Sequence, residues 1–172
     1  MKVVVAIDSL KGSLSSLEAG TAVSEGIHRC ISDAEVIVRP LADGGEGTVE
    51  ALACGMNGRI ENITVTGPLG EKVEAAYGII DNTNTAIIEM SAAAGIVLVK
   101  EEDRNPLNTT TYGVGELICD AIKNGCRKFI IGIGGSATND GGIGMLQALG
   151  YDFLDTAGRN VPFGAKGLAL IQ

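Results

Sequence analysis

The order of apolar and polar positions predicts alternating strands and helices up to about residue 56. Residues 3–7 form a continuous apolar run, which is typical of a strand covered on both faces. Ser15 and Glu18 have the spacing of a capping box, so a helix is expected to begin there. One face of this helix comprises Leu17, Gly20, Val23, Ile27 and Cys30. A second strand is predicted at 35–38 and a second helix at 45–56.

The pattern changes near residue 58. Apolar and polar residues alternate on both sides of a turn-rich connector at 66–70, which predicts an antiparallel hairpin. A strand at 85–90 leads into small residues, and helical spacing between 114 and 122 ends at Asn124-Gly125. The apolar run at 128–133 predicts another buried strand, and a short helix ending near residue 149 follows it.

These elements predict an α/β protein with two incomplete parts. Residues 1–58 would form an opening β-α-β-α unit, and residues 59–172 a second, mixed α/β domain that contains the hairpin. Two strands do not make a covered parallel sheet by themselves. We therefore expect that the chain is part of a longer protein and truncated at its C-terminus, or that its opening half borrows strands from the second half.

The composition of the chain argues against several classes of function. With 13 Lys and Arg against 21 Asp and Glu, the net charge is −8, which argues against nucleic-acid binding and against a polybasic membrane surface. No apolar run reaches the roughly 18 residues of a membrane span, and no signal peptide opens the chain, so a cytoplasmic protein is expected. The four cysteines have no C-x-x-C spacing or histidine partners, which argues for buried, reduced thiols rather than zinc. They are Cys30, Cys54, Cys119 and Cys126.

Glycine accounts for 25 of the 172 residues and gathers in loops that follow predicted strands. These loops lie at 8–13, 42–48, 90–95 and 134–142. Ligands of α/β proteins bind outside the carboxyl ends of strands. Because the loops combine acids, hydroxyls, a lysine and glycine amides, they are suited to binding phosphates and a metal ion.

The pattern Asp-Gly-Gly-x-Gly occurs twice, at 43–47 and 140–144, each time before a predicted helix. Asp43 and Asp140 could bind magnesium or accept a hydroxyl proton; alternatively, each is a helix N-cap. Lys11 follows Asp8 by three residues and would contact phosphate, or form only an exposed ion pair.

Other chemistries have weaker support. The P-loop pattern and the G-x-S-x-G elbow are absent, and the single histidine, His28, falls on a predicted helix away from the glycine-rich loops. Residues 132–137 fit G-x-G-x-x-[GA], with Asp152 twenty residues beyond Gly132. A dinucleotide-dependent oxidoreductase is therefore an alternative, provided that Asp152 lies at the end of a strand.

Four segments together resemble the bacterial glycerate kinase family, which phosphorylates glycerate with ATP and lacks a Walker motif. They are residues 6–14, 40–48, 104–113 and 132–149. Two departures are small, since Ile7 replaces the usual Pro and Leu10 the usual Phe. The resemblance implies two α/β domains, one of them flavodoxin-like, with the site between them. Family members continue well past Gln172.

We therefore expect an ATP- and Mg²⁺-dependent glycerate kinase, of which this chain is the N-terminal part. The expected partner is the small molecule glycerate, and homo-oligomerisation is left open. A non-catalytic α/β binding fragment is the other alternative. Asp140, Asp43 and Lys11 are the predicted catalytic residues, and the two aspartates are also the predicted metal ligands. The predicted substrate- and phosphate-binding residues are Asp8, Ser9, Gly44, Gly45, Glu46, Ser91, Gly134, Gly135, Ser136, Thr138 and Asn139.

Overall fold

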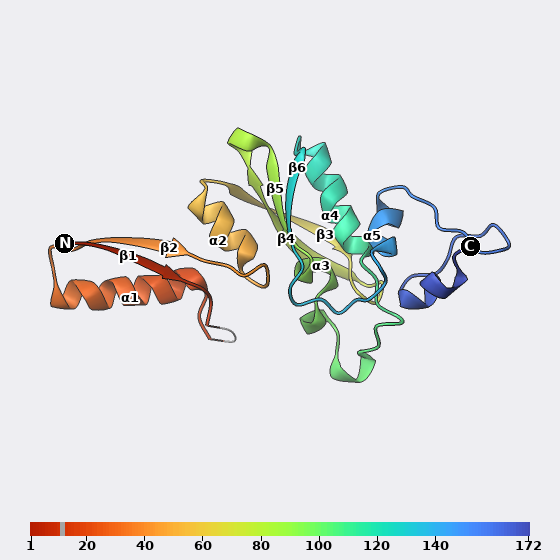
Figure 1. The fold of residues 1–172 in the computed structure, drawn as a ribbon, viewed down its shortest axis with the longest axis horizontal. Helices are drawn as coiled ribbons and strands as arrows, with labels where there is room; N and C mark the ends of the chain where they lie inside the picture. The colour runs from red at the N-terminus through yellow and green to blue at the C-terminus, as the bar shows by residue number, and fades with distance from the viewer. Residues whose placement is uncertain (11–12) are drawn as a thin grey trace.

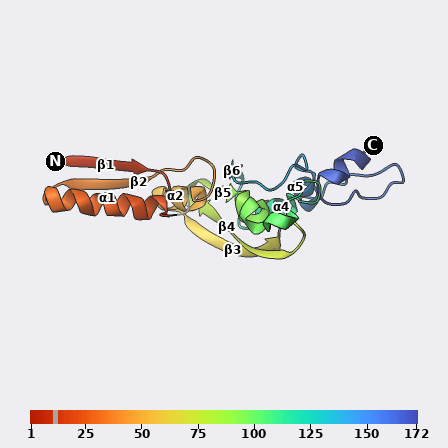
Figure 2. The same ribbon diagram turned by 90° about the horizontal axis from the view of Figure 1, so that it is seen from below.

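A two-stranded and a four-stranded sheet contain the named strands of this computed structural model, which describes residues 1–10 and 13–172. Figure 1 shows an elongated molecule with the two chain ends far apart. The two-stranded sheet lies at one end, the four-stranded sheet in the middle and the last segments at the other end. Figure 2 shows the same order from below.

The first sheet pairs β1 (Lys2–Ile7) in parallel with β2 (Glu35–Pro40), and α1 (Ser16–Cys30) packs against both strands. The predicted capping box is confirmed. The Ser15 hydroxyl accepts the Glu18 N–H at 3.2 Å, and the Glu18 carboxylate accepts the Ser15 N–H at 2.8 Å. Helix α1 therefore begins where the sequence predicts.

Burial in this first unit differs from the prediction. Of the expected apolar face of α1 only Gly20 is buried, whereas Leu17 and Val23 are 40% and 42% exposed. A Cβ on Gly20 would lie 2.4 Å from Val38 Cγ1, so the helix contacts the strands closely at its smallest residue. The prediction that β1 is covered on both faces is also wrong, because Val4 is 59% exposed. A sheet of two strands covers only the centre of the apolar face of α1. The face of the sheet that points away from α1 is left exposed.

The second sheet has the order β3-β4-β5-β6. Strands β3 (Arg59–Thr66), β4 (Lys72–Ile80) and β5 (Thr85–Glu89) pair antiparallel, and β6 (Lys128–Gly132) pairs parallel to β5. The predicted hairpin and the later strands are thus confirmed to within a few residues. The expected burial of the run 128–133 is wrong, because β6 is an edge strand and Ile133 beyond it is 76% exposed.

Helices cover both faces of this sheet, as Figure 1 shows. Side chains alternate between the two faces of a strand. The larger core lies under α3 (Ser91–Ala94) and α4 (Tyr112–Lys123), where it includes Tyr77, Ile88 and Leu117.

The smaller core lies on the opposite face, where α2 (Thr48–Gly55) packs against β4 and β5. It consists of Val49, Ile80 and Ile87. Helix α2 precedes the predicted boundary at residue 58, yet its packing partners belong to the following segment. It begins three residues later than predicted, because Gly44 and Gly47 have positive φ angles.

The chain ends in mostly irregular structure. Helix α5 (Ile143–Ala148) packs on α4 and is followed by an isolated bridge between Leu154 and Asn160 and by a 3₁₀ helix at Ala165–Leu170. Asp152 lies in no strand. The condition for the dinucleotide-dependent alternative is therefore not met. Shorter 3₁₀ helices occur at Asp81–Thr83, Ile96–Leu98 and Glu101–Asp103.

Among the described residues, no helix has both the length and the apolar character needed to cross a membrane. In the same part of the chain no three His, Cys, Asp or Glu residues are grouped as a metal site. Cys126 is buried and Cys119 partly buried, but Cys30 is exposed, so the prediction of buried thiols is wrong for Cys30. The side chain of Cys54 lies outside what the structure describes.

Candidate functional site

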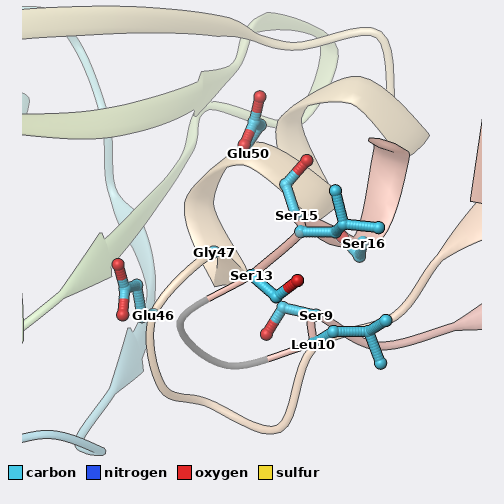
Figure 3. Close-up of a pocket in the computed structure, with 9 residues that line it drawn as sticks. Ser9, Leu10, Ser13, Ser15, Ser16, Glu46, Gly47 and Glu50 are labelled. Carbon is cyan, nitrogen blue, oxygen red and sulfur yellow. The ribbon is translucent and has the colours of Figure 1, made fainter. Parts of the chain in front are cut away.

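A hollow of about 370 Å³ lies between the segment after β1 and the start of α2 (Figure 3). Its serines come from the segment that joins β1 to α1 and from the first residue of α1. Its two glutamates come from the loop before α2 and from α2 itself. The hollow thus combines hydroxyl donors with carboxylates. It is lined by Ser9, Leu10, Ser13, Leu14, Ser15, Ser16, Glu46, Gly47 and Glu50.

Two of the predicted residues after β1 are described and one is not. Asp8 is half-buried, and its carboxylate accepts the N–H of Ser9 at 2.6 Å. Ser9 lines the first hollow. Lys11 lies outside the described residues.

The loop of residues 43–47 is fixed by its own polar groups. Asp43 is exposed, and its carboxylate accepts the N–H of Gly45 at 3.0 Å. The Thr48 hydroxyl donates to the Gly45 carbonyl at 2.7 Å. Gly44 and Gly47 have φ angles of +90° and +89°, which L-residues with side chains rarely adopt. Glycine at these two positions is therefore a requirement of the loop conformation.

The same loop packs directly on the loop that follows β6. The N–H of Gly134 donates to the Gly44 carbonyl at 3.0 Å. A Cβ on Gly132 would lie 2.5 Å from the Gly44 oxygen, and one on Gly134 would lie 2.8 Å from Gly45 Cα. Backbone meets backbone at this point. These glycines allow the loops after β2 and β6 to touch.

A second hollow, of about 240 Å³, links these loops to the end of β5. Glu46, Glu89, Ser91 and Gly135 line it, together with apolar residues of the segment 92–98. The Ile96 N–H donates to the Gly135 carbonyl at 2.8 Å, which fixes the loop after β5 to the loop after β6. Because Glu46 also lines the first hollow, the loops after β1, β2, β5 and β6 form one continuous surface.

Glu89 lines the second hollow and was not among the residues predicted from the sequence. It is the last residue of β5, it is 9% exposed, and its Oε1 accepts the N–H of Val49 at 2.7 Å. Burial raises the pKa of the Glu89 carboxyl, the backbone N–H groups of Val49, Gly47 and Thr48 lower it, and the Glu46 carboxylate adds to the increase. An acid that ends an otherwise apolar strand, two positions before Ser91, was the available signal.

Asp140 has an environment unlike that of Asp43. It is 1% exposed, and its carboxylate accepts the N–H and the hydroxyl of Thr111 and the N–H groups of Gly142 and Gly144. Gly142 is the N-cap residue of α5 and has no capping side chain of its own. The Asp140 carboxylate therefore caps α5, which is the alternative role that the sequence left open.

The remaining predicted residues line a third hollow, of about 340 Å³, beside α5 and the end of β6. Ser136 and Thr138 form a local turn, in which the Ser136 hydroxyl accepts the Thr138 N–H at 3.0 Å. Asn139 is exposed next to them. The walls of this hollow include Met90, Ile131, Ile133 and Met145, so it is largely apolar with a polar rim. The loop after β6 thus contributes to two hollows, through Gly135 to the second and through Ser136, Thr138 and Asn139 to the third.

Comparisons with known proteins agree with this arrangement. The glycerate kinase family pattern matches residues 3–172. A glycerate kinase of Haemophilus influenzae is 52% identical over 99% of this chain, and the glycerate 2-kinase of Escherichia coli is 51% identical over 98% of it. A crystal structure from Salmonella typhimurium LT2, provisionally named glycerate kinase 2, superposes with a TM-score of 0.91 at 50% identity over the whole chain.

The relatives are longer than this chain, so it matches only part of each of them. This chain covers 45% of the Haemophilus protein, 44% of the Escherichia coli protein and 46% of the Salmonella chain. It therefore spans less than half the length of these relatives. Within that span, the similarity includes all four loops that surround the hollows, and the resemblance noted from the sequence motifs is confirmed. The chain belongs to the glycerate kinase family.

Proposed function

We propose that the protein containing this chain transfers a phosphoryl group from ATP to glycerate. The observation that carries this proposal is the position of Glu46, which lines two adjoining hollows and so joins the loops after β1, β2, β5 and β6. Phosphoryl transfer needs positioning and charge neutralisation more than reactive side chains. Hydroxyls, glycine amides and carboxylates around one surface meet that need. The names of the relatives give the substrate class.

We assign the small hydroxy acid to the first hollow. Ser9 and Ser13 contribute hydroxyl groups that can donate to a carboxylate or phosphate oxygen. Glu46 and Glu50 line the same hollow, so a bound cation would be needed to offset their charge beside an anionic ligand. We assign Asp8 and Ser9 to substrate binding, and Lys11 to neutralising phosphate charge. Gly44 and Gly135 would provide backbone N–H groups for the anion, whereas the N–H groups of Gly45 and Gly134 already donate to the Asp43 carboxylate and the Gly44 carbonyl. Ser91, Ser136, Thr138 and Asn139 would provide polar groups along the loops.

Asp43 and Glu46 are the carboxylates that fit a magnesium ion. Both are exposed on the loop 43–47, and Mg²⁺ is commonly bound by one or two carboxylates together with substrate phosphates. Such an ion would neutralise phosphate charge when bound. We assign Asp43 the further role of accepting the proton of the attacking hydroxyl group. Asp140 fits neither role well, because both of its oxygens already accept hydrogen bonds within the protein.

An assay of ADP release, with Mg²⁺, ATP and glycerate and the full-length protein, tests this function. We expect ADP release that depends on glycerate, and a phosphoglycerate product visible by ³¹P NMR. No glycerate-dependent release, together with turnover of a nicotinamide cofactor, would replace the proposal with the oxidoreductase alternative. The 172-residue chain assayed in parallel tests whether it is a non-catalytic fragment. Cytoplasmic location and homo-oligomerisation stay predictions, to be checked by fractionation and light scattering.

A further inference from the structure

Helix α2 lacks a capping residue of its own. Its N-cap is Gly47, in the left-handed conformation and without a side chain. The first N–H groups of a helix need acceptors from outside the helix. Glu89, forty residues further along the chain, places a carboxylate oxygen 2.7 Å from the Val49 N–H. The acceptor for the first turn of α2 is thus at the end of β5.

This contact determines where the loop 43–47 ends. Helix α2 is short, at eight residues, so its first turn is a large part of it. Val49 packs with Ile80 and Ile87 under the helix, and Glu89 fixes the same turn by a hydrogen bond. Gly44 is fixed separately by Gly134. Between these two anchors lie Gly45 and Glu46, on the surface where we place substrate and metal.

We propose that Glu89 is a positioning residue, whose carboxylate caps α2 from the sheet and thereby sets the position of Glu46 and the rest of the loop 43–47 in the site. Its effect on turnover rests on the proposed function, whereas its effect on the loop does not. Glu89 would touch neither substrate nor metal. It acts through the backbone of Gly47, Thr48 and Val49, whose N–H groups stabilise its carboxylate.

Two other acids line the hollows beside Glu89, Glu46 from the loop and Glu50 from α2. Burial raises the pKa of the Glu89 carboxyl, and the backbone N–H groups at the start of α2 lower it. The role of Glu89 as an acceptor at α2 follows from its hydrogen bond to the Val49 N–H.

Glu89→Gln separates the acceptor from the charge. The glutamine side chain keeps an oxygen that can accept the Val49 N–H, so the loop should keep its position and most of the turnover should remain. Glu89→Ala removes the acceptor altogether.

The test compares Glu89→Ala, Glu89→Gln and a matched control, Glu116→Ala, in the full-length protein. Glu116 also accepts a backbone N–H from another element, that of Thr66, but it does so on α4, at the opposite face of the sheet from α2. Hydrogen–deuterium exchange of residues 44–50 measures the loop without any ligand. Steady-state kinetics with Mg²⁺, ATP and glycerate measure the effect of the loop position on kcat/KM.

In Glu89→Ala we expect the amide of Val49 to exchange at least about tenfold faster, because it loses its acceptor. We expect kcat/KM to fall by about a hundredfold, the scale of a misplaced site group. Glu89→Gln should retain turnover to within about tenfold, because the amide oxygen can still accept the Val49 N–H. Glu116→Ala should lower the melting temperature while kcat/KM stays within about threefold.

Unchanged exchange of the Val49 amide in folded Glu89→Ala would overturn the proposal, and so would faster exchange with unchanged kcat/KM. If the wild-type protein does not turn over glycerate, the proposed function fails. The exchange experiment still decides whether Glu89 positions the loop.

Discussion

The carboxylate of Asp140 accepts hydrogen bonds from both the backbone N–H and the hydroxyl of Thr111, each 2.9 Å from Oδ2. The same Thr111 hydroxyl accepts the N–H of Met145, in the first turn of α5. The two residues therefore join the start of α4 to the start of α5. Asp43 begins the same five-residue pattern, yet it is exposed and lies four positions before the N-cap of α2. Identical motifs have different structural roles here.

Asp140→Asn should destabilise the protein by about 2 kcal/mol. The asparagine NH₂ group would face N–H and O–H donors at a buried position, and an unsatisfied buried group costs about 1–3 kcal/mol. Urea unfolding of the full-length protein measures this change. Asp33→Asn, at an exposed position, is the control and should be silent. A double-mutant cycle with Thr111→Val should show coupling, because the two side chains share one hydrogen-bond network. Unaltered stability in Asp140→Asn would contradict the capping role.

Asp43→Asn should affect turnover and leave stability nearly unchanged. Asparagine keeps the side-chain oxygen that accepts the Gly45 N–H, so the turn should persist. Loss of the charge removes a proton acceptor and a metal ligand, and we expect kcat to fall by about a hundredfold or more. Steady-state kinetics across a range of Mg²⁺ concentrations, together with the melting temperature, make the comparison. Full activity in this variant would remove Asp43 from the proposed site.

Gly134→Ala should separate the loops after β2 and β6. Its Cβ would lie 2.8 Å from Gly45 Cα, so one backbone segment must shift. We expect a loss of about 1–3 kcal/mol of stability and a clear fall in kcat/KM. Gly26→Ala is the matched control, because a Cβ at Gly26 of α1 meets nothing within 4 Å. Alanine should stabilise that helix by about 1 kcal/mol. Equal effects of the two substitutions would show that loop contact is unimportant.

Tyr77 should make the fold sensitive to alkaline pH. Burial, followed by the hydrogen bond to Asp120, raises the pKa of its phenol to about 12. Since the folded-state pKa is raised, the contribution of Tyr77 to stability is complete below the unfolded-state value of 10.0 and is lost as the pH rises through about 12. Tyr77→Phe should reduce this loss, at a cost of about 1 kcal/mol near pH 8. Denaturant unfolding at pH 8 and pH 11 tests it.

Tyr151→Phe provides the comparison for that experiment, because Tyr151 is 62% exposed. Its unfolding free energy should match that of the wild type at both pH values. If Tyr77→Phe and Tyr151→Phe show the same pH dependence, the network of Tyr77 with Asp120 and Asn124 has no part in alkaline unfolding.

Local sequence determined most of the elements. The capping box of Ser15 and Glu18 gave the start of α1, because both of its hydrogen bonds join residues three positions apart. The alternating pattern around the turn at 66–70 gave the hairpin, and the helical spacing after residue 112 gave α4. The motifs also indicated the family, since the loops that contain them follow strands in a fixed order.

Only the tertiary structure decided what the glycine-rich loops do. No local pattern distinguishes Asp43 from Asp140, because the difference lies in Thr111, which packs against only one of them. Glu89 belongs to no sequence motif, because its hydrogen bond to Val49 joins residues forty positions apart. The predicted burial of Val4 and Ile133 was wrong. An apolar run indicates that a strand can be covered, but it does not say which elements of the fold cover it. Sequence patterns record local geometry, whereas the cap of α2 and the contact between Gly44 and Gly134 depend on how distant segments pack.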